Sequence, residues 1–138
     1  MMMKETYPVA AGDMTAAGDV SARIKRQMKL LGIPNSVMRR VAVGTYEAEI
    51  NLVIHSKGGK IDFEITPEGI SIRVTDVGPG IADLDKAMTE GWSTATSEVR
   101  NMGFGAGMGL PNMKRNADEF TITSEVGVGT DIHMLFHI

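Results

Sequence analysis

Residues 46–55 read YEAEINLVIH and place Glu47, Asn51 and His55 four residues apart in a segment that is otherwise largely apolar. In a helix, residues at i, i+4 and i+8 lie on one face. Because buried polar groups need hydrogen-bond partners, this polar line must face either solvent or a cavity. One interpretation is a solvated stripe. The other is a pocket in which Asn51 gives Mg²⁺ an oxygen ligand and Glu47 orients or deprotonates a nucleophile.

Helical and strand patterns continue on both sides of this segment. The predicted elements are a strand at 4–11, helices at 13–31 and 35–56, strands at 60–66 and 70–75, a short helical stretch at 83–88, a helix at 108–117, and strands at 120–124 and 131–136. This order predicts a single α+β domain over residues 1–138. The expected architecture is a two-layer sandwich with helices on one face of a mixed, mostly antiparallel sheet.

The first predicted helix has one apolar stripe, formed by Val20, Ile24 and Met28. Either Asp13 or Thr15 is expected to cap its start. The stripe suits the core and a dimer face equally well, so a homodimer remains open at this point.

A second polar motif, Asp76-Val-Gly78-Pro-Gly80, directly follows a predicted strand. It reads first as a turn, in which Asp accepts backbone N–H bonds and Gly allows unusual φ and ψ. The alternative is a carboxylate that accepts a hydrogen bond from an exocyclic amine such as adenine N6, beside glycines that admit a flat base. Residues 127–130, Gly-Val-Gly-Thr, are interpreted first as a tight hairpin and second as a ligand site.

Glycines occupy alternate positions from Gly103 to Gly109, at the start of a predicted helix. A glycine-rich loop that enters a helix N-terminus favours anion binding through free N–H groups and the helix dipole. The spacing matches neither the Walker A loop nor the Rossmann fingerprint. A merely flexible loop is the alternative. The long aperiodic stretch that contains these glycines predicts a lid at about 89–106.

The composition narrows the classes of function. The chain has 138 residues, 43% hydrophobic and 22% charged, which is typical of a globular protein. A net charge of -3, with no basic stripe, argues against nucleic acid as a partner. The chain has no cysteine, which excludes thiolate sites and suits the cytoplasm. We expect no membrane association, since no apolar stretch approaches the ~20 residues that span a bilayer.

Taken together, the four motifs resemble those of the GHKL ATPase/kinase superfamily, and the resemblance covers about Val37 to the C-terminus. Within that superfamily the chain is similar to the stand-alone serine/threonine kinases of bacterial partner-switching modules. The segments that carry this likeness are Tyr46–His55, Asp76–Ile81, Glu90–Thr94 and Gly109–Arg115. The resemblance implies a histidine-kinase-like ATP-binding fold with ATP and Mg²⁺ as cofactors.

The resemblance also implies roles for individual residues. Glu47 would be the general base, Asn51 would bind Mg²⁺, and Asp76 would bind the adenine amine. The remaining expected contacts are Gly78 and Gly80 beside the base, Gly103, Gly105, Gly107 and Gly109 at the phosphates, and Thr130 at adenine through water. Related anti-sigma kinases commonly carry an Arg just ahead of the phosphate-loop glycines, where this chain has Gly105-Ala106. The cation that neutralises the phosphates is therefore open among Lys57, Arg100 and Lys114.

The motifs and the resemblance are compatible with two functions. The first is an ATP- and Mg²⁺-dependent serine/threonine kinase that phosphorylates a small antagonist protein of the sulfate-transporter and anti-sigma antagonist (STAS) type. The second is an anti-sigma-type binding module that sequesters a sigma factor or a phosphatase, with ATP as a conformational ligand. A fragment of a sensor histidine kinase ranks below both, because no helix pair with a phospho-acceptor His is recognisable. A gyrase- or chaperone-type ATPase ranks last.

Overall fold

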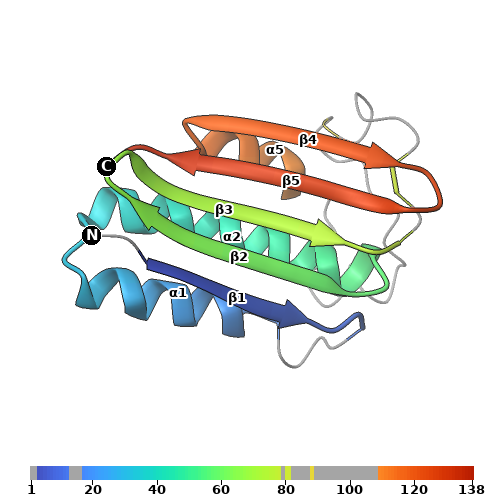
Figure 1. Ribbon diagram of the computed structural model, residues 1–138, viewed down its shortest axis with the longest axis horizontal. Helices are drawn as coiled ribbons and strands as arrows, with labels where there is room; N and C mark the ends of the chain where they lie inside the picture. The colour runs from blue at the N-terminus through green and yellow to red at the C-terminus, as the bar shows by residue number, and fades with distance from the viewer. Residues whose placement is uncertain (1–2, 13–16, 79, 82–87, 89–108) are drawn as a thin grey trace.

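The computed structural model describes residues 3–12, 17–78, 80–81, 88 and 109–138 (Figure 1). In chain order its elements are β1 (Met3–Val9), α1 (Asp19–Leu30), α2 (Asn35–His55), β2 (Gly59–Thr66), β3 (Gly69–Asp76), α5 (Gly109–Asn116), β4 (Glu119–Glu125) and β5 (Gly129–Phe136). These elements confirm the predicted order of strands and helices. The short helical stretch expected at 83–88 lies outside the described residues except for Met88.

The five strands form one sheet in the order β1-β2-β3-β5-β4. Every neighbouring pair is antiparallel, so the described strands contain no parallel pair and the expectation of a mixed sheet is corrected. The helices α1 and α2 lie between β1 and β2 in the chain, and the chain reverses direction at each step. As a result, β2 runs antiparallel to β1. β4 runs parallel to β3 without pairing with it, because β5 lies between these two strands and is antiparallel to both.

Within the described residues, the helices α1, α2 and α5 all cover the same face of the sheet (Figure 1). The core lies between the two layers and includes Phe63, Ile72 and Phe136 from the strands. Val20, Ile24 and Met28 of α1 are at most 6% exposed and belong to this core, so the stripe is not available as a dimer face. No helix in the described part of the chain is long and apolar enough to cross a membrane.

The start of α1 differs from the prediction. The helix begins at Asp19 after Gly18, which has a φ of 99°, and no side chain at this N-cap position makes a capping bond. Asp13 and Thr15, which were expected to cap the helix, lie outside the described residues, and the N-cap position is Gly18. The acceptor comes instead from Glu49 on α2, as described below.

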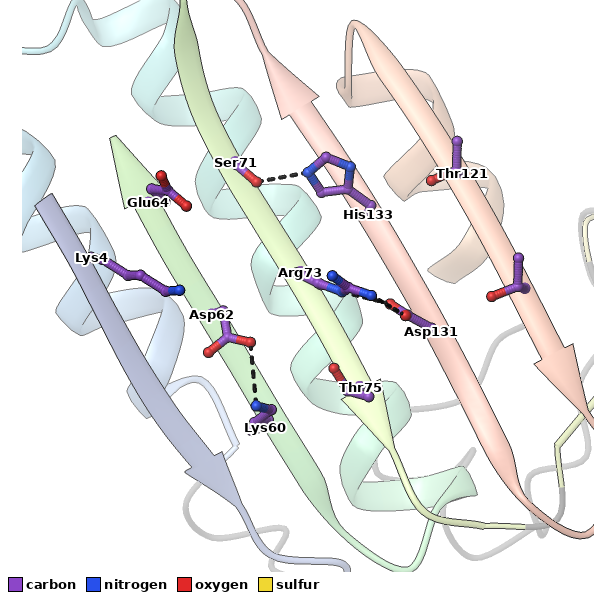
Figure 2. Close-up of a pocket in the computed structure, with 11 residues that line it drawn as sticks. Lys4, Lys60, Asp62, Glu64, Ser71, Arg73, Thr75, Thr121, Asp131 and His133 are labelled. Carbon is purple, nitrogen blue, oxygen red and sulfur yellow. Dashed lines mark hydrogen bonds and ion pairs between the residues drawn. The ribbon is translucent and has the colours of Figure 1, made fainter. Parts of the chain in front are cut away.

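The opposite face of the sheet is polar and open (Figure 2). Side chains alternate along each strand, so residues such as Asp62 and Arg73 point away from the helices while their neighbours enter the core. Two ion pairs lie on this face: Nη2 of Arg73 lies 2.6 Å from Oδ2 of Asp131, and Nζ of Lys60 lies 3.7 Å from Oδ2 of Asp62. These pairs describe a solvated surface, and the predicted site residues lie elsewhere.

Candidate functional site

The polar line on α2 is present as predicted. Glu47, Asn51 and His55 are each partly exposed, whereas Ala48 and Leu52 beside them are buried. Burial lowers the pKa of His55 below its ordinary value, because the charged imidazolium is poorly solvated there. The line therefore runs along the boundary between the core and an accessible edge of the helix.

The N-terminus of α5 packs against this line. A Cβ placed on Gly109 would lie 3.2 Å from Oδ1 of Asn51 and 3.4 Å from Oε2 of Glu47. The structure thus brings together Glu47 and Asn51 from one predicted motif and Gly109 from another. The absence of a side chain at position 109 lets the helix backbone approach the carboxylate and the amide closely.

A further residue of α5 contacts the same carboxylate. Asn112 donates from Nδ2 to Oε1 of Glu47 over 3.3 Å, and Arg115 donates from Nη1 to Oδ1 of Asn112 over 3.0 Å. Sequence reasoning did not assign either residue. The signal was available, since Gly109, Asn112 and Arg115 are spaced by three and share one helix face.

Asp76 lies at the end of β3 and is held by the neighbouring strand. Its Oδ1 accepts the backbone N–H of Thr130 over 2.8 Å. Burial raises the pKa of Asp76 above its ordinary value, and the Thr130 hydrogen bond partly opposes this rise. A half-buried carboxylate with a second oxygen suits the recognition of an N–H donor such as an exocyclic amine.

Thr130 itself is 9% exposed and is linked to Ser124 on β4. The two hydroxyl oxygens lie 3.0 Å apart, and Ser124 Oγ also accepts the N–H of Ile81 over 2.7 Å. Ser124 was not predicted, because an isolated Ser on a strand gives no functional signal. It connects the segment after β3 with the β4–β5 hairpin, and so holds both sides of the Asp76 region in place.

Close packing against neighbouring backbone explains why positions 78 and 80 are glycine. A Cβ on Gly80, whose φ is 71°, would overlap the carbonyl oxygen of Glu125. A Cβ on Gly78 would lie 3.3 Å from Cα of Ser56, just past the end of α2. The turn interpretation therefore applies to both glycines. The contact with Ser56 also brings the Asp76 loop to the C-terminal end of the helix that carries Asn51.

Glu49 is a buried carboxylate on the same helix, at 2% exposure. Its Oε2 accepts the N–H of Val20 over 3.0 Å and its Oε1 accepts the N–H of Ser21 over 3.2 Å. Two free donors at the start of α1 are thereby satisfied by a negative group, which the helix dipole also favours. Residues at i and i+2 face different sides of a helix, so Glu49 points away from the line of Glu47.

Several predicted site residues lie outside the described part of the chain: Gly103, Gly105, Gly107, Arg100 and the lid at 89–106. Of the other candidate cations, Lys57 and Lys114 are exposed. No group of three His, Cys, Asp or Glu side chains able to hold a metal occurs within the described residues. The oxygen atoms that could contact a metal are the amide oxygen of Asn51 and the carboxylate oxygens of Glu47. Mg²⁺ prefers oxygen ligands and commonly takes others from phosphate groups.

The chain is similar to known proteins over most of its length. The family described as histidine kinase-, DNA gyrase B-, and HSP90-like ATPase matches residues 39–138. The chain is 31% identical over 127 residues to the serine/threonine-protein kinase RsbT of Bacillus subtilis, covering 89% of this chain and 87% of that kinase. It is 36% identical over 97 residues to the anti-sigma F factor of Thermoanaerobacter sp., covering 67% of this chain and 64% of that factor. The anti-sigma F factor of Pasteuria penetrans is 32% identical over 96 residues, or 64% of this chain and 61% of that factor.

Proposed function

The chain belongs to the family of histidine kinase-, DNA gyrase B-, and HSP90-like ATPases and is of the partner-switching kinase type, and we propose that it phosphorylates a small STAS-type antagonist protein. The observation that carries the proposal is the convergence of Glu47 and Asn51 of α2 on Gly109 of α5, where a Cβ would lie 3.2 Å from Asn51 Oδ1 and 3.4 Å from Glu47 Oε2. In such a cluster Glu47 would serve as a base and Asn51 as an oxygen ligand, beside a helix N-terminus of the kind that favours phosphate.

ATP would lie between this cluster and Asp76. The free oxygen of Asp76 would accept the adenine amine, with Thr130 beside it and Gly78 and Gly80 allowing the base to approach. Asn51 would hold Mg²⁺, which supplies charge neutralisation for the phosphate oxygens when bound. The phosphates would extend toward Gly109 and the glycines of the 103–109 loop.

Glu47 would act as the general base. The hydroxyl oxygen of a serine or threonine on the acceptor protein forms a bond to the γ-phosphorus, and its proton passes to the Glu47 carboxylate. The bond from that phosphorus to the bridging oxygen breaks, and ADP leaves with the electron pair. A positioned base contributes about 10²–10⁴-fold to such a rate.

The similarity to anti-sigma F factors favours a second candidate, a module that sequesters a sigma factor with ATP as a conformational ligand. Pull-down from a bacterial lysate, with and without ATP, separates the two. Stoichiometric capture of a sigma factor supports the binding module. Capture of a STAS-type antagonist that becomes phosphorylated supports the kinase.

The direct test combines binding and transfer. Isothermal titration should give micromolar ATP affinity that requires Mg²⁺, is lost in EDTA and is lost in Asp76→Asn. Purified STAS-type antagonist proteins should acquire label from γ-³²P-ATP with the wild-type chain. Glu47→Ala should keep ATP affinity within about twofold and lose transfer by about 10²–10⁴-fold. Transfer retained in Glu47→Ala would remove this residue from the mechanism, and absence of ATP binding would refute the nucleotide site.

A further inference from the structure

Asn112 and Arg115 form a chain of hydrogen bonds that ends on the carboxylate of Glu47. The bond from Asn112 Nδ2 to Glu47 Oε1 is 3.3 Å, and that from Arg115 Nη1 to Asn112 Oδ1 is 3.0 Å. We propose that Asn112 is a positioning residue that holds the Glu47 carboxylate in the orientation needed to accept a proton, and that Arg115 fixes the Asn112 amide. The catalytic part of this inference rests on the proposed kinase function.

The amide of Asn112 has only one orientation that satisfies both neighbours. A guanidinium group only donates hydrogen bonds and an ionised carboxylate only accepts them. Oδ1 must therefore face Arg115, and Nδ2 must face Glu47. The flipped amide would place its oxygen against the carboxylate and its NH₂ group against the guanidinium, which loses both bonds. Arg115 thus selects the rotamer in which Asn112 can donate.

The position of α5 determines which carboxylate oxygen of Glu47 remains for chemistry. Asn112 contacts Oε1, whereas Oε2 lies toward Gly109 at the helix N-terminus. Oε2 is therefore the oxygen directed to the side where the phosphates and an acceptor hydroxyl would meet.

Fixing this carboxylate matters because proton transfer requires the base within hydrogen-bond reach of the hydroxyl. A displacement of about 1 Å at a reacting group can cost about 100-fold in rate. Loss of the Asn112 donor frees the carboxylate to rotate about its terminal bonds. Substrate binding does not use this bond, so the loss should appear in kcat and not in ATP affinity.

The kinetic test uses γ-³²P-ATP, Mg²⁺ and a purified STAS-type antagonist protein with the full chain. Asn112→Ala should lower kcat by about 10–100-fold with the ATP Kd changed less than about twofold. Asn112→Asp should lose at least as much, because it places a second acceptor-only carboxylate against Glu47. Asn116→Ala is the matched control: the same residue type, one turn further along α5, donating to a backbone carbonyl. Its kcat should stay within about twofold of wild type, and kcat retained in Asn112→Ala would overturn the inference.

A second measurement does not depend on phosphoryl transfer. The side-chain amide resonances of Asn112 in ¹H–¹⁵N spectra should move in Glu47→Gln and in Arg115→Met, while those of Asn35 at the far end of α2 should not. Unchanged Asn112 resonances in both variants would overturn the proposed chain of hydrogen bonds. The Asn112 resonances could move in both variants as expected while the wild-type chain transfers no phosphate. That outcome would refute the kinase function and the catalytic part of the inference, and would leave the hydrogen bonds themselves supported.

Discussion

At the Asp76 end of the candidate site the close contacts involve backbone atoms, whereas at the Glu47 end they involve the tips of side chains. A Cβ on Gly129 would overlap the carbonyl oxygen of Asp76, and one on Gly80 would overlap that of Glu125. For a Cβ on Gly109, the three nearest atoms among the described residues would instead belong to the side chains of Asn51 and Glu47, at 3.2–3.5 Å. Backbone in a sheet cannot move aside, but side chains can. We therefore expect substitutions at the first end to affect folding and those at the second to affect ligand binding.

The largest expected effect is that of Gly129→Ala. Gly129 has a φ of 155°, and the new methyl group would collide with the backbone of β3. The free energy of unfolding should fall by about 2–5 kcal/mol, from overpacking together with backbone strain. Urea unfolding followed by circular dichroism measures this change.

Gly127→Ala is the matched control for Gly129→Ala, because it lies two residues away in the same hairpin. Its φ is 82° and nothing lies within 4 Å of its Cβ position, so it carries only the conformational penalty of about 1–2 kcal/mol. Equal losses in the two variants would show that backbone collision is not the dominant cost at Gly129.

Glu49→Ala should have the next largest effect. Removing the buried carboxylate leaves the N–H groups of Val20 and Ser21 without their acceptor. An unsatisfied buried donor costs about 1–3 kcal/mol, and the donor of Ser21 is only half-buried, so the free energy of unfolding should fall by about 2–4 kcal/mol. Glu49→Gln keeps one acceptor oxygen and should lose about half as much.

Hydrogen exchange locates the effect of Glu49→Ala within the chain. The amides of Val20 and Ser21 should lose protection before those in the middle of α1. Glu68→Ala, in the exposed β2–β3 turn, is the control and should change the free energy of unfolding by less than about 0.5 kcal/mol. Unchanged protection at Val20 in Glu49→Ala would contradict the capping role.

Gly109→Ala should affect ligand binding more than stability. The methyl group must displace the ends of Asn51 and Glu47 by a few tenths of an ångström, which these side chains can accommodate. Ala also favours a helix by up to about 1 kcal/mol over Gly, so the free energy of unfolding should change by less than about 1 kcal/mol. The Kd for ATP with Mg²⁺ should rise about tenfold, the equivalent of about 1.4 kcal/mol. Isothermal titration with unchanged affinity would show that crowding at this point does not reach the ligand.

The sequence predicted those parts of the fold and the site that follow from local pattern. The alternation of β2 and β3 and the i, i+4, i+8 line on α2 required no knowledge of distant residues. The cap of α1 could not be predicted in this way, because its acceptor lies 28–29 residues along the chain. A carboxylate at position 49, on the opposite side of α2 from the polar line, could have indicated a buried partner. The link from Ser124 to Ile81 depends on strand order, which the local pattern does not contain.

The smallest effect concerns the pH dependence of stability at Asp76. Burial raises the pKa of this carboxyl in the folded chain above the ordinary value of 3.8, so in that range the folded state binds more protons than the unfolded state. The contribution of Asp76 to stability must then decrease as pH rises from about 3.8 through the folded pKa, and stay constant above it.

Asp76→Asn keeps an oxygen acceptor for the Thr130 N–H but does not titrate. The variant should therefore gain in stability relative to wild type as pH rises across this window, although it loses ATP affinity. Urea unfolding of both proteins at closely spaced pH values between pH 3.5 and 7 measures the difference in the free energy of unfolding. A difference that is flat with pH would mean that the Thr130 hydrogen bond fully offsets burial, and that the free oxygen of Asp76 is better solvated than its position beside β5 indicates.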